Sequence, residues 1–238
     1  MRRATRDPRA EARESARVRD RFGLVLLLLL ITVFVSIAAP DESWVSLSAT
    51  IALGVAVAIA LLASGADRRA IRLGISVTVI VVVMAAVGGS FTEGDTSSGV
   101  LAAAGLLLTG TTIGAIGRRI RMHAEISGLT VLGALCIYVL IGLSFAFVYE
   151  LVGALGPEPF FASGDAGTRS DFTYFSFITM ATVGYGDLVA AGGVGRAVAV
   201  LEGILGQIYL VTAVAALIGN LGRRRRDVQQ ELGQPPEA

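Results

Sequence analysis

Long apolar runs alternate with short polar connections along this chain. Each run approaches or exceeds the ~20 residues that a helix needs to cross a bilayer. The runs cover residues Phe22–Ala39, Val45–Ala63, Ile71–Gly88, Gly99–Ile116, Ile126–Val152 and Gly193–Leu221. The first four are apolar nearly all round, as expected for helices packed in lipid. The pattern predicts an all-α membrane protein with six transmembrane helices.

The connection between the last two runs contains a further short element. Residues 171–181 (DFTYFSFITMA) read as a helix, with Ser170 or Asp171 available as N-cap. About ten residues at ~1.5 Å each reach only ~15 Å, half of the bilayer core. We therefore expect a re-entrant helix that ends in the middle of the membrane. Non-helical backbone at that depth is tolerated where it is buried in protein or faces water.

The sequence Thr182-Val183-Gly184-Tyr185-Gly186-Asp187 follows this short helix. Glycine adopts left-handed dihedrals without a Cβ penalty, and Gly184 and Gly186 stand at alternate positions. Such a backbone can point successive carbonyls the same way and replace the water shell of a bare cation. One chain supplies one carbonyl per level, so a cage requires several chains around an axis.

This sequence resembles the TVGYG signature of the potassium channel superfamily. The resemblance extends from Ile126 onward and indicates a bacterial six-transmembrane member with a two-helix pore module. It implies a homotetrameric pore in which K⁺ is the permeant ion and no cofactor is needed. The expected K⁺ sites are formed by Thr182, Val183, Gly184 and Tyr185, with Gly186 completing the selectivity filter and Asp187 at the outer mouth. Residues 182–187 are called the filter segment below.

The last run, which the resemblance makes the inner pore helix, carries three further hypotheses. Gly206 and Gly203 are candidate gating hinges, although close helix packing explains small residues equally well. Glu202 is the one acid well inside a run, which makes it a functional hypothesis. It either tunes the filter, with Thr179 or Ser176 as partner, or is a protonated structural glutamate. The predicted cavity-lining residues share one helix face and are Gln207, Leu210, Val214 and Ile218.

Charge is distributed unevenly along the chain. All 20 basic residues are arginine, and 18 of them lie in residues 2–21, 68–72, 118–121 and 223–226. Because cytoplasmic loops are enriched in basic residues, both termini are predicted to be cytoplasmic in a multi-pass protein of the cell membrane. The filter segment then faces outside, where Glu158, Asp165, Asp171 and Asp187 would attract cations. Residues 99–117 lack arginine, so we expect no arginine-based voltage sensor.

The predicted organisation has five parts. They are a cytoplasmic arm (1–21), a four-helix transmembrane domain (22–117), a cytoplasmic linker (118–125), a pore domain (126–221) and a cytoplasmic tail (222–238). Within the pore domain we expect an outer helix (126–152), a turret (153–170), a pore helix (171–181), the filter segment (182–187) and an inner helix (193–221).

Other functional classes receive less support. A weakly selective cation channel, or a non-conducting membrane scaffold or regulatory subunit, remains an alternative. An enzyme is not expected, because the chain has one cysteine, Cys136, and one histidine, His123, and no catalytic constellation. Membrane lipids are expected partners, whereas nucleic acids and small-molecule substrates are not. The sequence does not indicate what stimulus opens the pore.

Overall fold

The computed structural model describes residues 8–38, 43–63, 72, 75–77, 79–80, 83, 95–122 and 128–233. Its elements are helices, as the apolar runs predict. They are α1 (Pro8–Ala38), α2 (Ser43–Ala63), α4 (Asp95–Met122), α5 (Gly128–Leu155), α6 (Arg169–Met180) and α7 (Gly193–Gly233). Within these residues β-structure is limited to an isolated bridge between Phe161 and Ala190. The all-α class is therefore confirmed for the described part of the chain.

Three of the six predicted spans correspond to helices that are long and apolar enough to cross a membrane. These helical stretches are Gly99–Arg118, Val131–Leu155 and Gly193–Ala216. The first two runs correspond to shorter apolar stretches, Phe22–Ala38 and Ile51–Leu62. The run Ile71–Gly88 lies largely outside the described residues. The count of six spans thus stays a prediction.

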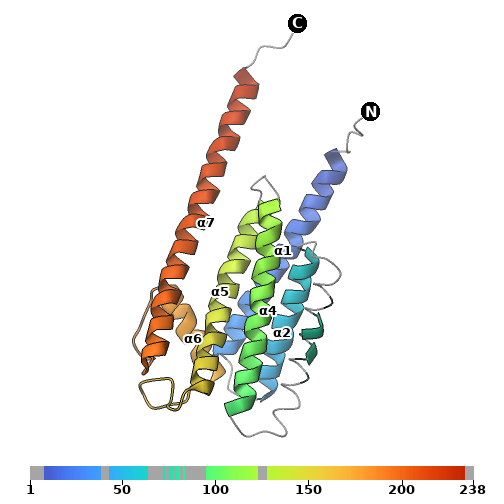
Figure 1. The fold of residues 1–238 in the computed structure, drawn as a ribbon. Coiled ribbons are helices and arrows are strands. Elements are labelled where there is room, and N and C mark those ends of the chain that lie inside the picture. Colours follow the sequence, from blue (N-terminus) through green and yellow to red (C-terminus); the bar gives the residue numbers. More distant parts are fainter. Residues whose placement is uncertain are drawn as a thin grey trace.

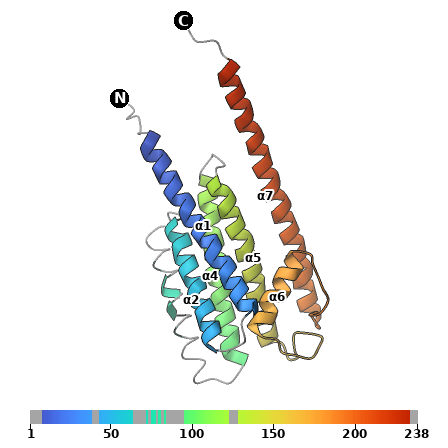
Figure 2. The same cartoon turned by 180° about the vertical axis from the view of Figure 1, so that it is seen from behind.

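Helix α5 lies at the centre of the fold. It packs against α4 and α1 on one side and against α6 and α7 on the other. Helices α1, α2 and α4 form a bundle with α5, while α7 stands at the edge of the molecule (Figures 1 and 2). The start of α1 and the end of α7 point to the same end of the bundle, and α6 lies toward the opposite end (Figure 1). The location of both termini in the cytoplasm stays a prediction.

The seam between α4 and α5 joins the N-terminal bundle to the C-terminal module. A Cβ atom added to Gly105 would lie 2.6 Å from the Phe147 ring, so the aromatic ring packs directly on the α4 backbone. One turn further along, the Ser144 hydroxyl donates to Thr109 Oγ1 at 2.8 Å. The missing side chain of Gly105 thus leaves room for the Phe147 ring, and the hydrogen bond between Ser144 and Thr109 fixes how α4 and α5 are aligned along their length.

The helix boundaries differ from the predicted domain limits in several places. Helix α5 continues to Leu155, three residues past the predicted end, and α6 covers Arg169–Met180 in place of 171–181. Helix α4 extends through the first part of the predicted linker, whereas His123 lies outside the described residues. Helix α7 runs through the basic cluster of the predicted tail to Gly233, because arginine is a good helix former. Likewise, the described part of the arm is the first half of α1.

Candidate functional site

Helix α6 begins with a capping box. Thr168 is the N-cap, and its hydroxyl accepts a hydrogen bond from the Asp171 backbone N–H at 3.3 Å. In return the Thr168 backbone N–H donates to the Asp171 carboxylate at 2.8 Å. The prediction of Ser170 or Asp171 as N-cap was therefore wrong. Asp171 occupies the third helical position, and the Ser170 hydroxyl donates instead to the Ile37 carbonyl of α1 at 3.2 Å.

A cluster of aromatic side chains holds α6 against α5. Phe172 and Phe175 of α6 are buried among Tyr149 of α5 and Phe160 and Phe161 of the loop that follows it. Ring centroids in this cluster lie 5.0 to 6.0 Å apart, and most pairs meet edge to face. Such pairs add to the stabilisation that burial alone provides. The position of α6 is thus fixed by packing as well as by its cap.

The loop before α6 is also tied to the chain that follows the filter segment. The Ala162 N–H donates to the Val189 carbonyl at 2.8 Å, and the Ala191 N–H donates to the Phe160 carbonyl at 2.9 Å. The filter segment is therefore anchored at its far end by a short antiparallel bridge. Arg196, at the start of α7, donates to the Ala190 carbonyl at 3.1 Å and supports the same bridge.

The filter segment leaves α6 in a tight turn. The N–H groups of Thr182 and Val183 donate to the carbonyls of Thr179 and Ile178 at 2.9 and 2.8 Å. Beyond this turn, φ is positive at every second residue: 56° at Thr182, 52° at Gly184 and 81° at Gly186. The two glycines adopt the left-handed conformation that their spacing predicts. Thr182 adds a third such position, which the sequence did not indicate.

The filter segment is otherwise open within one chain. In the described part of the chain, the carbonyls of residues 182–186 accept no hydrogen bond. The side chains of Val183 and Tyr185 are 49% and 74% exposed. A single copy therefore does not provide the packing behind the filter that we expect for these two side chains.

Asp187 closes the filter segment with a hydrogen bond to the short helix. The Tyr174 hydroxyl of α6 donates to the Asp187 carboxylate at 2.8 Å. This hydrogen bond holds the pKa of Asp187 below its usual range. The remaining acids of the predicted outer mouth are arranged differently: Glu158 and Asp165 are exposed on the loop, whereas Asp171 is engaged in the capping box. No cluster of metal-ligating side chains occurs among the described residues.

The predicted partners of Glu202 lie on the correct helix. Its carboxyl group is fully buried and contacts the Ser176 hydroxyl of α6 at 2.5 Å. Thr179, the other candidate, makes no such contact in the described structure. A second partner, the Tyr149 hydroxyl of α5, also lies at 2.5 Å and was missed by the sequence analysis. The only signal for it was a tyrosine in an apolar span, since a buried tyrosine hydroxyl usually finds a partner.

The two hinge candidates differ in their surroundings. A Cβ atom at Gly206 would lie 2.6 Å from Met180 Cγ and 3.0 Å from the Met180 carbonyl, so α7 packs closely on the end of α6 there. At Gly203 the nearest neighbour is the Thr179 carbonyl, 3.9 Å away. The structure thus shows close packing at Gly206, and the hinge role stays a prediction for both.

The predicted cavity-lining face is partly described. Leu210 and Val214 are 41% and 44% exposed, and Gln207 is half-buried. The Ile218 side chain lies outside the described side chains. The exposed residues do share one face of α7, and one copy of the chain leaves that face without cover.

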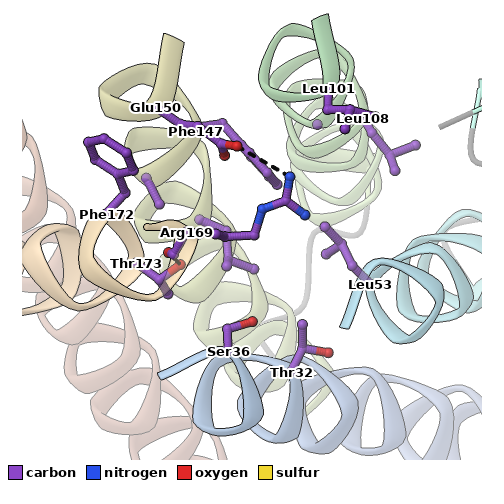
Figure 3. Close-up of a pocket in the computed structure, with 13 residues that line it drawn as sticks. Thr32, Ser36, Leu53, Leu101, Leu108, Phe147, Glu150, Arg169, Phe172 and Thr173 are labelled. Carbon is purple, nitrogen blue, oxygen red and sulfur yellow. Dashed lines mark hydrogen bonds and ion pairs between the residues drawn. The ribbon is translucent and has the colours of Figure 1, made fainter. Parts of the chain in front are cut away.

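A pocket lies where α6 meets the N-terminal bundle (Figure 3). Its cavity of about 40 Å³ is lined by hydroxyl side chains of α1 and mainly by apolar side chains of α2, α4, α5 and α6. Arg169, at the start of α6, points into it and pairs with Glu150 of α5 at 3.3 Å (Figure 3). The sequence analysis assigned no role to this ion pair, which joins α5 to the start of α6.

Comparison with known proteins gives the class of this module. Residues 133–223 match a family model described as an ion channel. The match covers most of α5, all of α6, the filter segment and most of α7. It supports an ion-channel function for the part of the chain that contains the site.

The chain is also similar to one curated protein over a stretch about as long as the family match. The chain is 34% identical over 88 residues to Protein LctB of Geobacillus stearothermophilus, which is 34% of this chain and 65% of that protein. The chain therefore spans slightly less than two thirds of the length of this relative. No solved structure matches the chain significantly.

Proposed function

We propose that four copies of this chain form a potassium channel that conducts K⁺ passively across the cell membrane. The observation that carries the proposal is the backbone of the filter segment. The backbone φ is positive at every second residue, namely Thr182, Gly184 and Gly186. The carbonyls of residues 182–186 accept no hydrogen bond within the described chain. Carbonyl oxygens that the fold leaves without partners are available to replace the hydration shell of K⁺.

Several features support assembly around an axis. Residues 182–186 are exposed in one copy of the chain, so their carbonyls are open to water, ions or neighbouring copies. Helix α7 is apolar over Gly193–Ala216, but only 11% of this stretch is buried, against 44% for Val131–Leu155 of α5. Its exposed residues include Val200, Leu201, Ile204, Ile208 and Val211. Neighbouring subunits would cover part of this surface and the exposed side chains of Val183 and Tyr185.

The distribution of charge supports an orientation. The arginine-rich segments at the start of α1 and the end of α7 are at one end of the bundle, opposite α6 (Figure 1). With the arginines in the cytoplasm, the outer end of the filter segment faces outside. The ionised carboxylate of Asp187 then lies at the outer mouth and raises the local cation concentration.

Flux from liposomes tests the proposal. Purified protein is reconstituted, and K⁺ efflux is compared with Na⁺ efflux, with Ba²⁺ as pore blocker. Gly184→Ala forces a Cβ atom onto a backbone with φ of 52°, which costs about 1–2 kcal/mol per left-handed residue. We expect this variant to insert normally but to lose selective flux.

Gly192→Ala is the matched control. Gly192 lies just beyond the filter segment, has open space around its Cβ position and has no positive φ. It should conduct like the unaltered protein. Equal fluxes of K⁺ and Na⁺ would favour a weakly selective cation channel, and absence of flux across pH, lipid and voltage would favour a non-conducting scaffold.

A further inference from the structure

A buried network joins the three helices around the filter segment. The Tyr149 hydroxyl of α5 and the Ser176 hydroxyl of α6 both contact the Glu202 carboxyl of α7 at 2.5 Å. The Ser176 hydroxyl also lies 2.7 Å from the Gly142 carbonyl of α5. All three side chains are fully buried. The network therefore has three short oxygen–oxygen contacts, each of which needs one hydrogen.

The available hydrogens fix the protonation of this network. The Gly142 carbonyl can only accept, so the single hydroxyl hydrogen of Ser176 is directed to it. The Tyr149 hydroxyl hydrogen serves the contact with one carboxyl oxygen of Glu202. The contact between Ser176 and the other carboxyl oxygen then has a hydrogen only if the carboxyl group itself is protonated. An ionised Glu202 leaves two oxygens 2.5–2.7 Å apart with no hydrogen between them.

The surroundings of Glu202 agree with a neutral group. Among the described residues, the salt bridge is the pair of Arg169 and Glu150, so no basic side chain is paired with Glu202 there. A buried carboxylate without a cation carries a large desolvation cost, and such groups remain neutral instead. The titratable side chain in contact with Glu202 is the phenol of Tyr149, which is neutral as a donor.

We propose that Glu202 is a positioning residue that works as a neutral hydrogen-bond donor and holds α6 between α5 and α7. This inference rests on the proposed channel function. Ser176 lies in the second half of α6, and Thr182 begins the filter segment at the end of that helix. Loss of the Glu202 contact releases α6 from α7 and disturbs the base of the filter.

Two substitutions separate hydrogen bonding from charge. In Glu202→Gln the amide N–H₂ donates to Ser176 while the amide oxygen accepts from Tyr149, so every contact of the neutral acid is retained. Glu202→Leu has similar bulk but has no hydrogen-bonding group. We expect Glu202→Gln to keep selective K⁺ flux within about twofold and Glu202→Leu to lower it roughly tenfold or more, the scale of losing a buried polar partner.

The tyrosine provides a matched pair of controls. Tyr149→Phe keeps the ring in the aromatic cluster but removes the donor to Glu202. Tyr209→Phe removes a similar hydroxyl between α7 and α5. The Tyr209 hydroxyl donates to the Ala134 carbonyl at 2.7 Å and makes no contact with Glu202. We expect the first variant to reduce flux and the second to leave it near the unaltered level.

Infrared spectroscopy gives a readout that does not depend on conduction. At neutral pH the unaltered protein should show the carbonyl stretch of a protonated carboxyl group. That band should shift when glutamate is labelled with ¹³C, and it should be absent in Glu202→Gln. A carboxylate band assigned to Glu202, or equal loss of flux in Glu202→Gln and Glu202→Leu, overturns the proposal.

The two proposals can fail separately. If the unaltered protein conducts no K⁺, the infrared band still reports whether Glu202 is protonated, and the thermal stability of the two variants still tests its contacts. If selective K⁺ flux is present but the carboxyl group is ionised, the channel function stands and the role of Glu202 as neutral donor is wrong.

Discussion

Replacement of Gly206 by alanine tests whether the inner helix packs on the base of the filter. The added Cβ atom would lie 2.6 Å from Met180 Cγ and 3.0 Å from the Met180 carbonyl. Carbon atoms in contact prefer about 3.5–4.0 Å, so the Met180 side chain must rotate away, and the contact with the Met180 carbonyl needs a further shift of roughly a few tenths of an ångström between the helices. Rotation of the Met180 side chain does not relieve the backbone contact. Because Met180 ends α6, the displacement acts directly on the residues that lead into the filter segment.

The expected magnitude follows from two opposing terms. Overpacking of a close contact costs about 1–3 kcal/mol. Alanine is favoured over glycine in a helix by about 0.8–1.0 kcal/mol. Gly206→Ala should therefore lose up to about 2 kcal/mol of stability. Gly203→Ala, one turn away with its nearest neighbour at 3.9 Å, meets only ordinary contacts and should be neutral or slightly stabilising.

Both variants are measured in the same two assays. Thermal unfolding in detergent reports stability, and K⁺ flux from liposomes reports the filter. We expect Gly206→Ala to melt at lower temperature and to conduct less, with Gly203→Ala close to the unaltered protein. If Gly206 acts instead as a flexible hinge, Gly206→Ala will reduce flux while its stability is kept, and the packing argument is refuted. Reduced flux with unchanged stability in Gly203→Ala would place the hinge at Gly203.

Three further predictions concern the supports of the site. Gly105→Ala should destabilise the seam of α4 and α5 by about 1–3 kcal/mol because its Cβ meets an aromatic ring, whereas Gly110→Ala in the same helix meets open space and should not, as thermal unfolding will show. Tyr174→Phe removes the hydrogen bond that lowers the pKa of Asp187, so this pKa should rise toward its usual range. As the pH falls, Asp187 should then become protonated at a higher pH in the variant than in the unaltered protein, which carbon NMR titration measures. Thr168→Ala should cost about 1 kcal/mol through loss of the N-cap, and Thr168→Ser should retain it.

Hydropathy predicted the helices better than their ends. The apolar runs of α4, α5 and α7 are visible because a lipid-facing helix needs no polar face. Their ends are less visible, since arginine favours helix and no proline interrupts α7 before residue 235. The N-cap of α6 shows the same difficulty. Thr168, Ser170 and Asp171 are all capping residues, and the choice depends on tertiary contacts such as that of Ser170 with α1.

The filter segment was predictable in part. Gly184 and Gly186 indicated left-handed backbone because only glycine adopts it freely. The positive φ of Thr182 was not predictable, since a β-branched residue rarely adopts this conformation. Ser176 was anticipated as a partner of Glu202 because both lie near the filter in sequence order. Tyr149 was not, because α5 is apolar on every side and its sequence does not show which face meets α7.

The supports of α6 come from every helix that it contacts, and they act at different points along it. Its first turn is held by Ser170 against α1 and by the Arg169 ion pair against α5. Its second half is held by Glu202 and by the close approach of Gly206, both on α7. A displacement of the N-terminal bundle therefore acts on the start of α6, whereas a displacement of α7 acts at the base of the filter segment. Gly142 of α5 also contacts the second half of α6 through Ser176, at 2.7 Å. Since a binding site is only as well ordered as the residues that support it, we expect a displacement of α1 to reach the filter segment through the start of α6, and a displacement of α5 or α7 to reach it through the end of α6.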